Sequence, residues 1–467
     1  MLNKRINKYI RGFAAGLACM MLVPGIAFAA EDTAVVTETV TETAEEAVPT
    51  PSTIATNNLT GWPQGPEINS RTACLMDANT GAILYDKNML EKMYPASTTK
   101  VLTALLAIEN SSLDEVVVFT ETGVAEAYSG SSNLNTQVGE EFTMEECLYA
   151  LMLKSANDFA SQIAEHVGGS VEGFCQMMNE RAAAIGCVNT HFNNAHGMPD
   201  ENHYTCAYDL ALIMREALKN ETFCKVATTR KFEISNTTLS GKRTVTSHNE
   251  LINEGPYYFE GCLGGKTGYT DAAGNTFVSG AERNGMTLIE VTMFSPSSAD
   301  SFMNAKTLYE YGFNNFINHV VEEGNHLYSG GSITLPNGMA AEVYTEKDGE
   351  VFATSFGNMM WRYFYYEDHK IGEVAVTEES MLEEQRLQEE IAQKIAEQRA
   401  LEEQRLEDIK NNVLSEPMLE PISKELFTVS HIIIGVFIVL IGLGIIAIVV
   451  TLIVKSVRKR RKRRKSK

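Results

Sequence analysis

Two groups of strand-like segments enclose a helical stretch, and this order limits the folds open to the chain. The segment RTACLMDANTGAILYDKN has the pattern of two strands around a turn at residues 79–81. The segment KTGYTDAAGNTFVSGAERNGMTLIEVTMF has the pattern of three strands, with turns at residues 271–274 and 284–285. Apolar helical patterns lie between the two groups. We therefore predict an α/β domain over residues 68–315, whose sheet gathers the terminal strands.

The sequence after this domain changes character twice. Short strand-like runs, GSITL, AAEVYTE, GEVFATS and WRYFYY, are separated by turn residues and predict a small all-β domain over residues 316–378. Residues 379–414 are highly charged, contain EEQRL twice and show only a broken apolar stripe. Because no sustained heptad is present, we predict a charged helical stalk, with self-association through it as the alternative.

The N-terminus has the pattern of an export signal. Four basic residues precede an apolar stretch and the small-x-small sequence Ala27-Phe28-Ala29, which predicts a secretory signal peptide over residues 1–29. An uncleaved anchor is the alternative. Residues 30–67 are rich in Thr, Glu, Ala, Val and Pro without a helical or strand period, so we expect a disordered acidic leader there.

A second apolar stretch lies near the C-terminus. Residues 432–454 contain no charge and are long enough as a helix to cross a bilayer. The tail at 455–467 holds ten Lys or Arg residues, which the positive-inside rule places in the cytoplasm. We therefore predict one transmembrane helix with the large domain outside the cell. A nucleic-acid patch is the alternative explanation of the basic tail.

The charge of the remaining chain excludes some partners. The two terminal segments hold 14 of the 39 basic residues and none of the 60 acidic ones, so residues 31–454 carry a net charge of about −35. Such a surface repels nucleic acid and anionic lipid headgroups. Seven cysteines outside the signal peptide are scattered without a C-x-x-C pair, so we predict neither a disulfide framework nor a metal site, and no cofactor.

Ser97 and Lys100, in MYPASTTK, stand three residues apart where a helix is expected to begin. This spacing puts both side chains on one helical face. Serine becomes a useful nucleophile when a nearby base takes its proton, and a lysine can be that base if burial or other cations lower its pKa. The same pair also arises by chance, and Lys100 would then be an ordinary exposed residue.

Two further motifs follow in the chain. Ser155 and Asn157 form an S-x-N at the end of an apolar helix, where a helix-capping loop is the simpler explanation. Lys266-Thr267-Gly268 stands at the start of a predicted strand, where the lysine could merely protect a sheet edge. In this order, S-x-x-K, S-x-N and K-T-G are the motif set of penicillin-recognising serine enzymes.

Longer segments carry the same similarity. LMDANTGAILYDKNMLEKMYPASTTKVLTALLAIE, LMLKSANDFASQIAEHVGG, AHGMPDENHYTCAYDLALIMREAL and GGKTGYTDAAGNTFVSGAERNGMTLI together resemble the low-molecular-mass penicillin-binding proteins that are serine-type D-alanyl-D-alanine carboxypeptidases. The resemblance covers about residues 68–315. It implies a serine β-lactamase/transpeptidase-like domain, an antiparallel sheet flanked by helices.

The resemblance also implies a role for each motif residue. It makes Ser97 the acylated nucleophile, Lys100 its base, and Ser155 the relay of a proton to the leaving D-alanine. It assigns substrate binding to five residues. Asn157 would hold the substrate backbone, Lys266 and Thr267 its terminal carboxylate, Gly268 would let it lie against the strand, and Tyr269 would complete the oxyanion hole with its backbone N–H.

The implied activity is removal of the terminal D-alanine from peptidoglycan stem peptides ending in D-Ala-D-Ala, with β-lactams as covalent inhibitors. Ser301 stands where the family commonly has an arginine that contacts the carboxylate. One alternative is a β-lactamase, which needs a dedicated deacylating base that we do not expect in this chain. The other is a non-catalytic protein that binds cell-wall peptides. His196 is expected to be structural.

Overall fold

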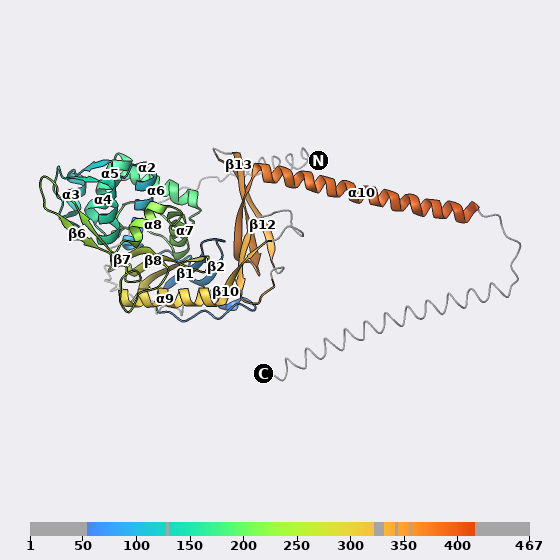
Figure 1. Ribbon diagram of the computed structural model, residues 1–467, viewed down its shortest axis with the longest axis horizontal. Helices are drawn as coiled ribbons and strands as arrows, with labels where there is room; N and C mark the ends of the chain where they lie inside the picture. The colour runs from blue at the N-terminus through green and yellow to red at the C-terminus, as the bar shows by residue number, and fades with distance from the viewer. Residues whose placement is uncertain (1–53, 128–129, 322–330, 341–343, 355–356, 416–467) are drawn as a thin grey trace, which may run out of the picture. The chain divides into compact units, whose positions relative to one another are not determined.

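The computed structural model describes residues 54–127, 130–321, 331–340, 344–354 and 357–415 of the 467-residue chain (Figure 1). The predicted signal peptide, the transmembrane segment 432–454 and the basic tail 455–467 lie outside these residues. Within the described ranges, no helix has the length and apolar character needed to cross a membrane.

The main sheet has five antiparallel strands in the order β2-β1-β9-β8-β7. It joins the two ends of the domain, as the strand pattern predicted, because β1 pairs with β9 in a register that sets Ala73 opposite Thr292. The strands are β1 Thr72–Asp77, β2 Ile83–Lys87, β7 Cys262–Thr270, β8 Gly274–Arg283 and β9 Met286–Ser295.

Strand β1 is buried on both sides and separates two apolar cores. Because successive side chains of a strand point to opposite faces, Ala73 and Leu75 pack in the core beneath α9 (Ser298–Asn315), whereas Cys74 and Met76 pack in the core of the other helices. Figure 1 shows α9 along one face of the sheet, with the remaining helices of the domain on the other. This is the antiparallel sheet flanked by helices that was predicted.

The helical part of the domain includes two small two-stranded sheets. Its helices are α2 Lys100–Asn110, α3 Glu121–Ala127, α4 Met144–Tyr149, α5 Asn157–Gly168, α6 Val171–Ile185, α7 Ala207–Ala217 and α8 Glu221–Thr228. One sheet pairs β3 Val116–Val118 with β4 Glu141–Thr143 on either side of α3, and the other is a hairpin of β5 Lys231–Ile234 and β6 Arg243–Thr246.

One expected helix is divided in two. The pattern of MEECLYALMLKSANDFASQIAEHVG, residues 144–168, predicts one helix, but α4 passes into a π-type turn, Ala150–Lys154, before α5 begins at Asn157. Ser155 has a φ of 62°, in the left-handed region, and this conformation cannot continue a right-handed helix. The regular spacing of apolar residues continues through this break, because the side chains on both sides of it are buried. The sequence pattern therefore gave no indication of it.

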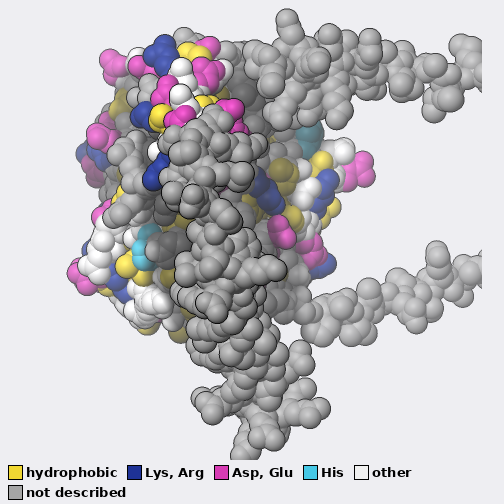
Figure 2. Space-filling model, turned by 90° about the vertical axis from the view of Figure 1, so that its right-hand side faces the viewer, with side chains coloured by type: hydrophobic (Ala, Val, Ile, Leu, Met, Phe, Trp, Pro, Cys, Tyr) yellow, Lys and Arg dark blue, Asp and Glu magenta, His cyan; other side chains and the backbone are white. Residues whose placement is uncertain are grey.

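A second antiparallel sheet follows α9, with the order β10-β11-β14-β13-β12. Its strands are β10 Phe316–Val320, β11 Ser332–Pro336, β12 Thr345–Thr354, β13 Gly357–Tyr366 and β14 His369–Thr377. The charged repeat forms the helix α10, Glu378–Ser415, on which Leu382, Ile395 and Leu406 are exposed. On the described part of the face in Figure 2, acidic side chains are interspersed with basic ones.

The expectation of a disordered leader up to residue 67 is wrong for residues 54–67. Trp62 is 4% exposed and donates a hydrogen bond of 3.1 Å from Nε1 to the Leu84 carbonyl. Tyr85 donates to the Pro66 carbonyl over 3.1 Å, and Ile54 forms a bridge with Lys87. The buried side chains of Trp62 and Ile54 attach this segment to the core, although the surrounding composition is polar.

Candidate active site

Ser97 lies in a short turn that leads into α2. The turn, Ala96–Thr99, is a 3₁₀ helix, so Ser97 stands just before the α-helix rather than inside its first turn as predicted. Ala96 has a φ of 50°, a left-handed conformation that costs a non-glycine residue of order 1 kcal/mol or more. Such strain persists where the surrounding structure enforces it, and here it sets the direction of the Ser97 backbone.

Lys100 is fully buried below Ser97, and its Nζ atom has three neighbours. Nζ lies 3.1 Å from Ser97 Oγ, 2.6 Å from Asn157 Oδ1 and 2.7 Å from the His196 carbonyl oxygen. The last two atoms can only accept. A neutral amine has two N–H groups and one lone pair, so donating to both acceptors leaves its lone pair for the Ser97 hydroxyl.

The electrostatics favour that neutral form. Burial, together with the charge of Lys266, holds the pKa of Lys100 well below its usual range. Burial also lowers the pKa of Lys266 to about 7. A lysine with a lowered pKa can accept a proton near neutral pH, which is the property that a general base requires.

The S-x-N pair lies between the π-type turn and α5. Ser155 is buried, and its Oγ makes no hydrogen bond to any group of the described chain. A buried hydroxyl without a partner is costly, and here it belongs to a residue in a left-handed conformation at the cleft. Asn157 is the first residue of α5, and its side chain is directed to Lys100.

The K-T-G residues lie inside strand β7, beyond its start. Lys266 is 1% exposed and donates to the Thr267 carbonyl over 2.8 Å, whereas Tyr269 is 61% exposed. The fold requires glycine at position 268 for a reason that we did not predict. A Cβ atom there would lie 2.8 Å from Ser97 N, so only glycine lets β7 approach the nucleophile this closely.

These elements surround a cleft of about 510 Å³. Its lining brings together five of the predicted site residues: Ser97, Ser155, Thr267, Gly268 and Tyr269. The other three, Lys100, Asn157 and Lys266, are buried and do not line it. The motifs therefore converge from three separate parts of the chain onto one site.

Several lining residues carried no motif. Ser132 comes from the segment between α3 and β4, and Ser247, His248 and Glu250 come from the loop after β6. Burial and the charges of Lys266 and Lys154 lower the pKa of His248 to about 4. No local pattern marks these residues, because only the tertiary fold brings their loops to the cleft.

Two positions bear on the expected departures from the family pattern. Ser301, in the first turn of α9, is buried and lines the cleft with a neutral hydroxyl. We expected no dedicated deacylating base of the kind that a β-lactamase supplies from a Glu-x-x-x-Asn element. Such a spacing does occur between the S-x-N and K-T-G motifs, at Glu216 and Asn220. Glu216 pairs with Arg181 and Lys219, and it does not line this cleft.

His196 contributes through its backbone. Its carbonyl accepts from Lys100, while its imidazole lies 3.5 Å from Glu126. Gly197 permits this arrangement, because a Cβ atom there would lie 1.8 Å from the Ala96 carbonyl oxygen. Among the described residues, no group of three or more His, Cys, Asp or Glu side chains is placed to hold a metal ion.

Comparison with known proteins agrees with this geometry. Residues 60–297 match the family model described as D-alanyl-D-alanine carboxypeptidase. The chain is 31% identical to DacF of Bacillus subtilis over 55% of its own length and 65% of the relative's. It is 31% identical to DacB2 of Mycobacterium tuberculosis over 54% of its own length and 84% of the relative's.

A solved structure shows the same fold over a longer part of the chain. Penicillin-binding protein 6B of Escherichia coli superposes with a TM-score of 0.54, at 24% identity, over 68% of this chain and 98% of that protein. At this identity the likeness describes the fold alone.

Proposed function

The chain belongs to the D-alanyl-D-alanine carboxypeptidase family of serine peptidases, and we propose that it removes the terminal D-alanine from peptidoglycan stem pentapeptides through an acyl-enzyme at Ser97. The observation that carries this proposal is the contact of 3.1 Å between Ser97 Oγ and the buried Lys100 Nζ. It supplies a nucleophile that lines a cleft large enough for the end of a peptide, with a buried base beside it.

Acylation begins with attack of Ser97 Oγ on the carbonyl carbon of the D-Ala-D-Ala bond. The serine proton passes to Lys100 Nζ, whose other two directions are taken by Asn157 and the His196 carbonyl. The developing oxyanion is stabilised by the backbone N–H groups of Ser97 and Tyr269. The Ser155 hydroxyl, which has no partner elsewhere in the described chain, relays a proton to the leaving D-alanine amine as the C–N bond breaks.

Deacylation uses water as the second substrate. Water attacks the ester carbonyl and gives up a proton, Ser97 Oγ takes a proton from Lys100 as its bond to the peptide breaks, and the shortened peptide leaves with a new carboxyl group. A β-lactam presents a similar carbonyl, but its leaving group stays attached to the acyl-enzyme. It therefore remains close to the ester and hinders the approach of water, which supports long-lived inhibition by β-lactams.

Recognition of the terminal carboxylate falls to Lys266 and Thr267 on β7. Thr267 lines the cleft with its hydroxyl, and Lys266 is buried beside it. Ser301 can add a hydroxyl at the position where the family commonly has an arginine. An extended peptide can also add to the edge strand β7 by main-chain hydrogen bonds. Asn157 can serve both groups, because its Oδ1 atom accepts from Lys100 while its Nδ2 group remains a donor for the substrate backbone.

A β-lactamase is disfavoured, because the only Glu-x-x-x-Asn spacing between the two later motifs has its glutamate paired at another surface. A non-catalytic binding protein is disfavoured by the buried base and the unpaired Ser155 hydroxyl, which binding alone does not require.

The deciding experiment is incubation of the full-length protein with a pentapeptide ending in D-Ala-D-Ala. We expect D-alanine to be released by the parent and not by Ser97→Ala. Absence of release by a folded parent would contradict the proposal, and rapid hydrolysis of a chromogenic cephalosporin would favour the β-lactamase.

We also propose a location. After cleavage of the signal peptide, a single transmembrane helix at 432–454 would anchor the protein in the cell membrane. The sheet β10–β14 and α10, as a charged stalk, would separate the exported domain from the membrane. This proposal is supported by the sequence patterns at the two termini. Protease added to intact protoplasts should remove the domain, and protection until lysis would contradict the topology.

A further inference from the structure

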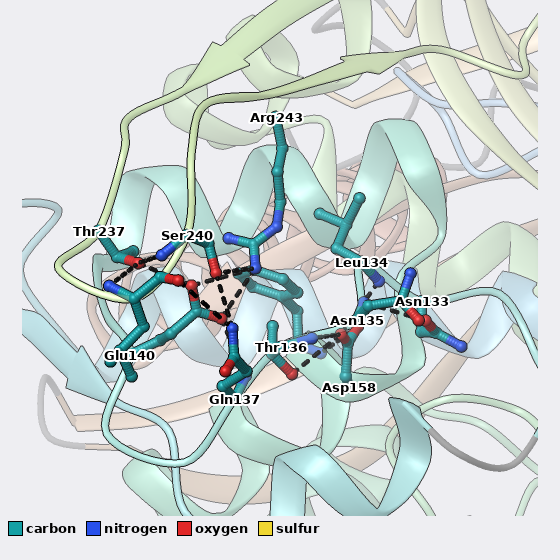
Figure 3. Close-up of polar contacts among 12 residues, drawn as sticks. Asn133, Leu134, Asn135, Thr136, Gln137, Glu140, Asp158, Thr237, Ser240 and Arg243 are labelled. Carbon is teal, nitrogen blue, oxygen red and sulfur yellow. Dashed lines mark hydrogen bonds and ion pairs between the residues drawn. The ribbon is translucent and has the colours of Figure 1, made fainter.

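An irregular segment, residues 130–140, connects α3 to β4 and forms one wall of the cleft. It supplies Ser132 to the lining. Figure 3 shows how this segment is held from inside the protein: Asp158 points toward Leu134 and Thr136 near one end, and Glu140 meets Arg243, Thr237 and Ser240 at the other. The two carboxylates thus anchor the same wall at different places.

Asp158 follows Asn157 directly in the chain and is 0% exposed. Its Oδ2 atom accepts hydrogen bonds from Leu134 N at 3.0 Å, Thr136 Oγ1 at 3.1 Å and Thr136 N at 3.4 Å. Its Oδ1 atom accepts from Phe159 N at 3.0 Å. Burial raises the pKa of Asp158, while these donors act in the opposite direction by stabilising the carboxylate.

The segment held by Asp158 in turn holds Asn157. The backbone N–H of Asn157 is at the first position of α5, where no intrahelical acceptor exists, and it donates to the Ser132 carbonyl over 2.7 Å. Ser132 Oγ donates to the Lys154 carbonyl over 2.8 Å. Asn157 Oδ1 then accepts from Lys100, the proposed base. Hydrogen bonds and the short backbone path from Leu134 to Ser132 therefore connect the Asp158 carboxylate to Asn157, Lys100 and Ser97.

We propose that Asp158 is a positioning residue for acylation: by holding residues 132–136 against the start of α5, it fixes Asn157 on Lys100 and keeps Ser132 at the cleft wall. This inference rests on the proposed function. It predicts that Asp158 acts on the rate of covalent bond formation, while initial binding of a ligand in the cleft depends on it much less.

Glu140 provides a matched control. It is also 0% exposed and anchors the same segment, accepting from Gln137 N at 2.9 Å, Arg243 Nη2 at 2.8 Å and Thr237 Oγ1 at 2.7 Å. Its partners lie on this segment and on the β5–β6 hairpin, and none of these contacts involves Asn157. Loss of Glu140 should therefore loosen residues 137–140, while Asp158 still holds residues 132–136 and with them the contact between Asn157 and Lys100.

The test compares Asp158→Asn and Glu140→Gln in the full-length protein. The acylation rate constant and the non-covalent dissociation constant are measured separately with a chromogenic β-lactam, per folded molecule, across pH. For Asp158→Asn we expect acylation to fall at least tenfold with binding changed less than threefold. The midpoint of the pH profile should move to lower pH, because the charge of Asp158 raises the pKa of Lys100. Glu140→Gln should leave rate and midpoint unchanged.

Thr136→Val keeps the side-chain volume, removes one donor to Asp158, and decides the matter if Asp158→Asn does not fold. It should lower acylation about threefold per folded molecule, with only a modest fall in melting temperature from the lost hydrogen bond. Parent-like acylation in Thr136→Val and in any folded Asp158→Asn would overturn the inference. If Glu140→Gln showed the same selective loss as Asp158→Asn, the inference would also fail. Absence of both labelling and D-alanine release in the parent would instead overturn the proposed function.

Discussion

Asn157 Oδ1 accepts a hydrogen bond of 2.6 Å from Lys100 Nζ. The resemblance assigned Asn157 to the substrate, and in this structure the Oδ1 atom of the same side chain also contacts the proposed base. Together with the His196 carbonyl, it leaves Lys100 one direction for proton transfer, and that direction faces Ser97.

A change at Asn157 should therefore alter the pH dependence of acylation. Asn157→Asp places a carboxylate beside Lys100, which favours the charged ammonium and raises the pKa of Lys100. Less neutral amine is then present at pH 7, so acylation should slow at least tenfold there and recover at higher pH. The rate of β-lactam acylation across pH measures this, and a profile with an unmoved midpoint would contradict it.

Two arginine substitutions separate a base from a fixed cation. Labelled penicillin should attach at Ser97 and be lost in Ser97→Ala. Lys100→Arg should lose most labelling, because a guanidinium does not give up its proton near neutral pH. Lys266→Arg keeps the charge that faces the substrate carboxylate and should retain more activity than Lys100→Arg. Equal labelling of Lys100→Arg and the parent would exclude lysine as the base.

Gly268→Ala should damage catalysis through the backbone of Ser97. The new methyl group would lie 2.8 Å from Ser97 N and 2.4 Å from Thr276 Oγ1, so β7 and the turn at Ser97 must separate. We expect acylation to fall at least tenfold, about 1.4 kcal/mol of barrier. Gly241→Ala, in the exposed loop between β5 and β6 with no neighbour within 4 Å of the added atom and no positive φ, is the control for a general effect of alanine. A parent-like rate in Gly268→Ala would show that the strand can yield without cost.

Lys266 should cost stability near neutral pH. Its pKa is about 7 in the folded protein and near 10.4 when unfolded, so between these values the unfolded state binds more protons. The cost of burying this amine is therefore fully present below about pH 7. It is relieved as the pH rises from about 7 toward 10, so the free energy of unfolding increases over that range. Lys266→Met should raise the free energy of unfolding at pH 7 by on the order of 3 kcal/mol. In urea unfolding, the advantage over the parent should shrink by pH 9; a constant difference would contradict the assigned pKa.

The ordered segment before the domain gives a separate stability prediction. Trp62→Ala removes a buried ring that lies 5.1 Å from that of Phe316, and should cost about 3 kcal/mol of unfolding free energy. Deletion of residues 31–50, which we predict to be leader, serves as the comparison and should leave stability unchanged. Similar unfolding midpoints for Trp62→Ala and the parent would show that the segment is only loosely attached.

The sequence predicted the covalent chemistry better than the shape of the cleft. Ser97 and Lys100 were found because a nucleophile and its base can be recognised by spacing on one helical face. The contribution of His196 could not be found in this way, since a carbonyl group belongs to every residue and only the fold brings this one to Lys100. Ser132 and His248 reach the cleft on irregular segments whose paths depend on distant contacts. Trp62 was overlooked because the polar residues around it dominated the local composition.

The pairing of β1 with β9 also determines when this protein can fold. Ala73 and Thr292 are opposite each other across about 220 residues of intervening chain, so the sheet closes through one of its longest-range contacts. Forming that contact requires closure of a very large loop, and a high contact order slows folding. In a growing chain that ends before β9, one edge of β1 is unpaired. The apolar side chains on both faces of β1 also lack their neighbours in the sheet, and such a state is prone to aggregation. Completion of the sheet must therefore wait for the last strand of the domain to be synthesised.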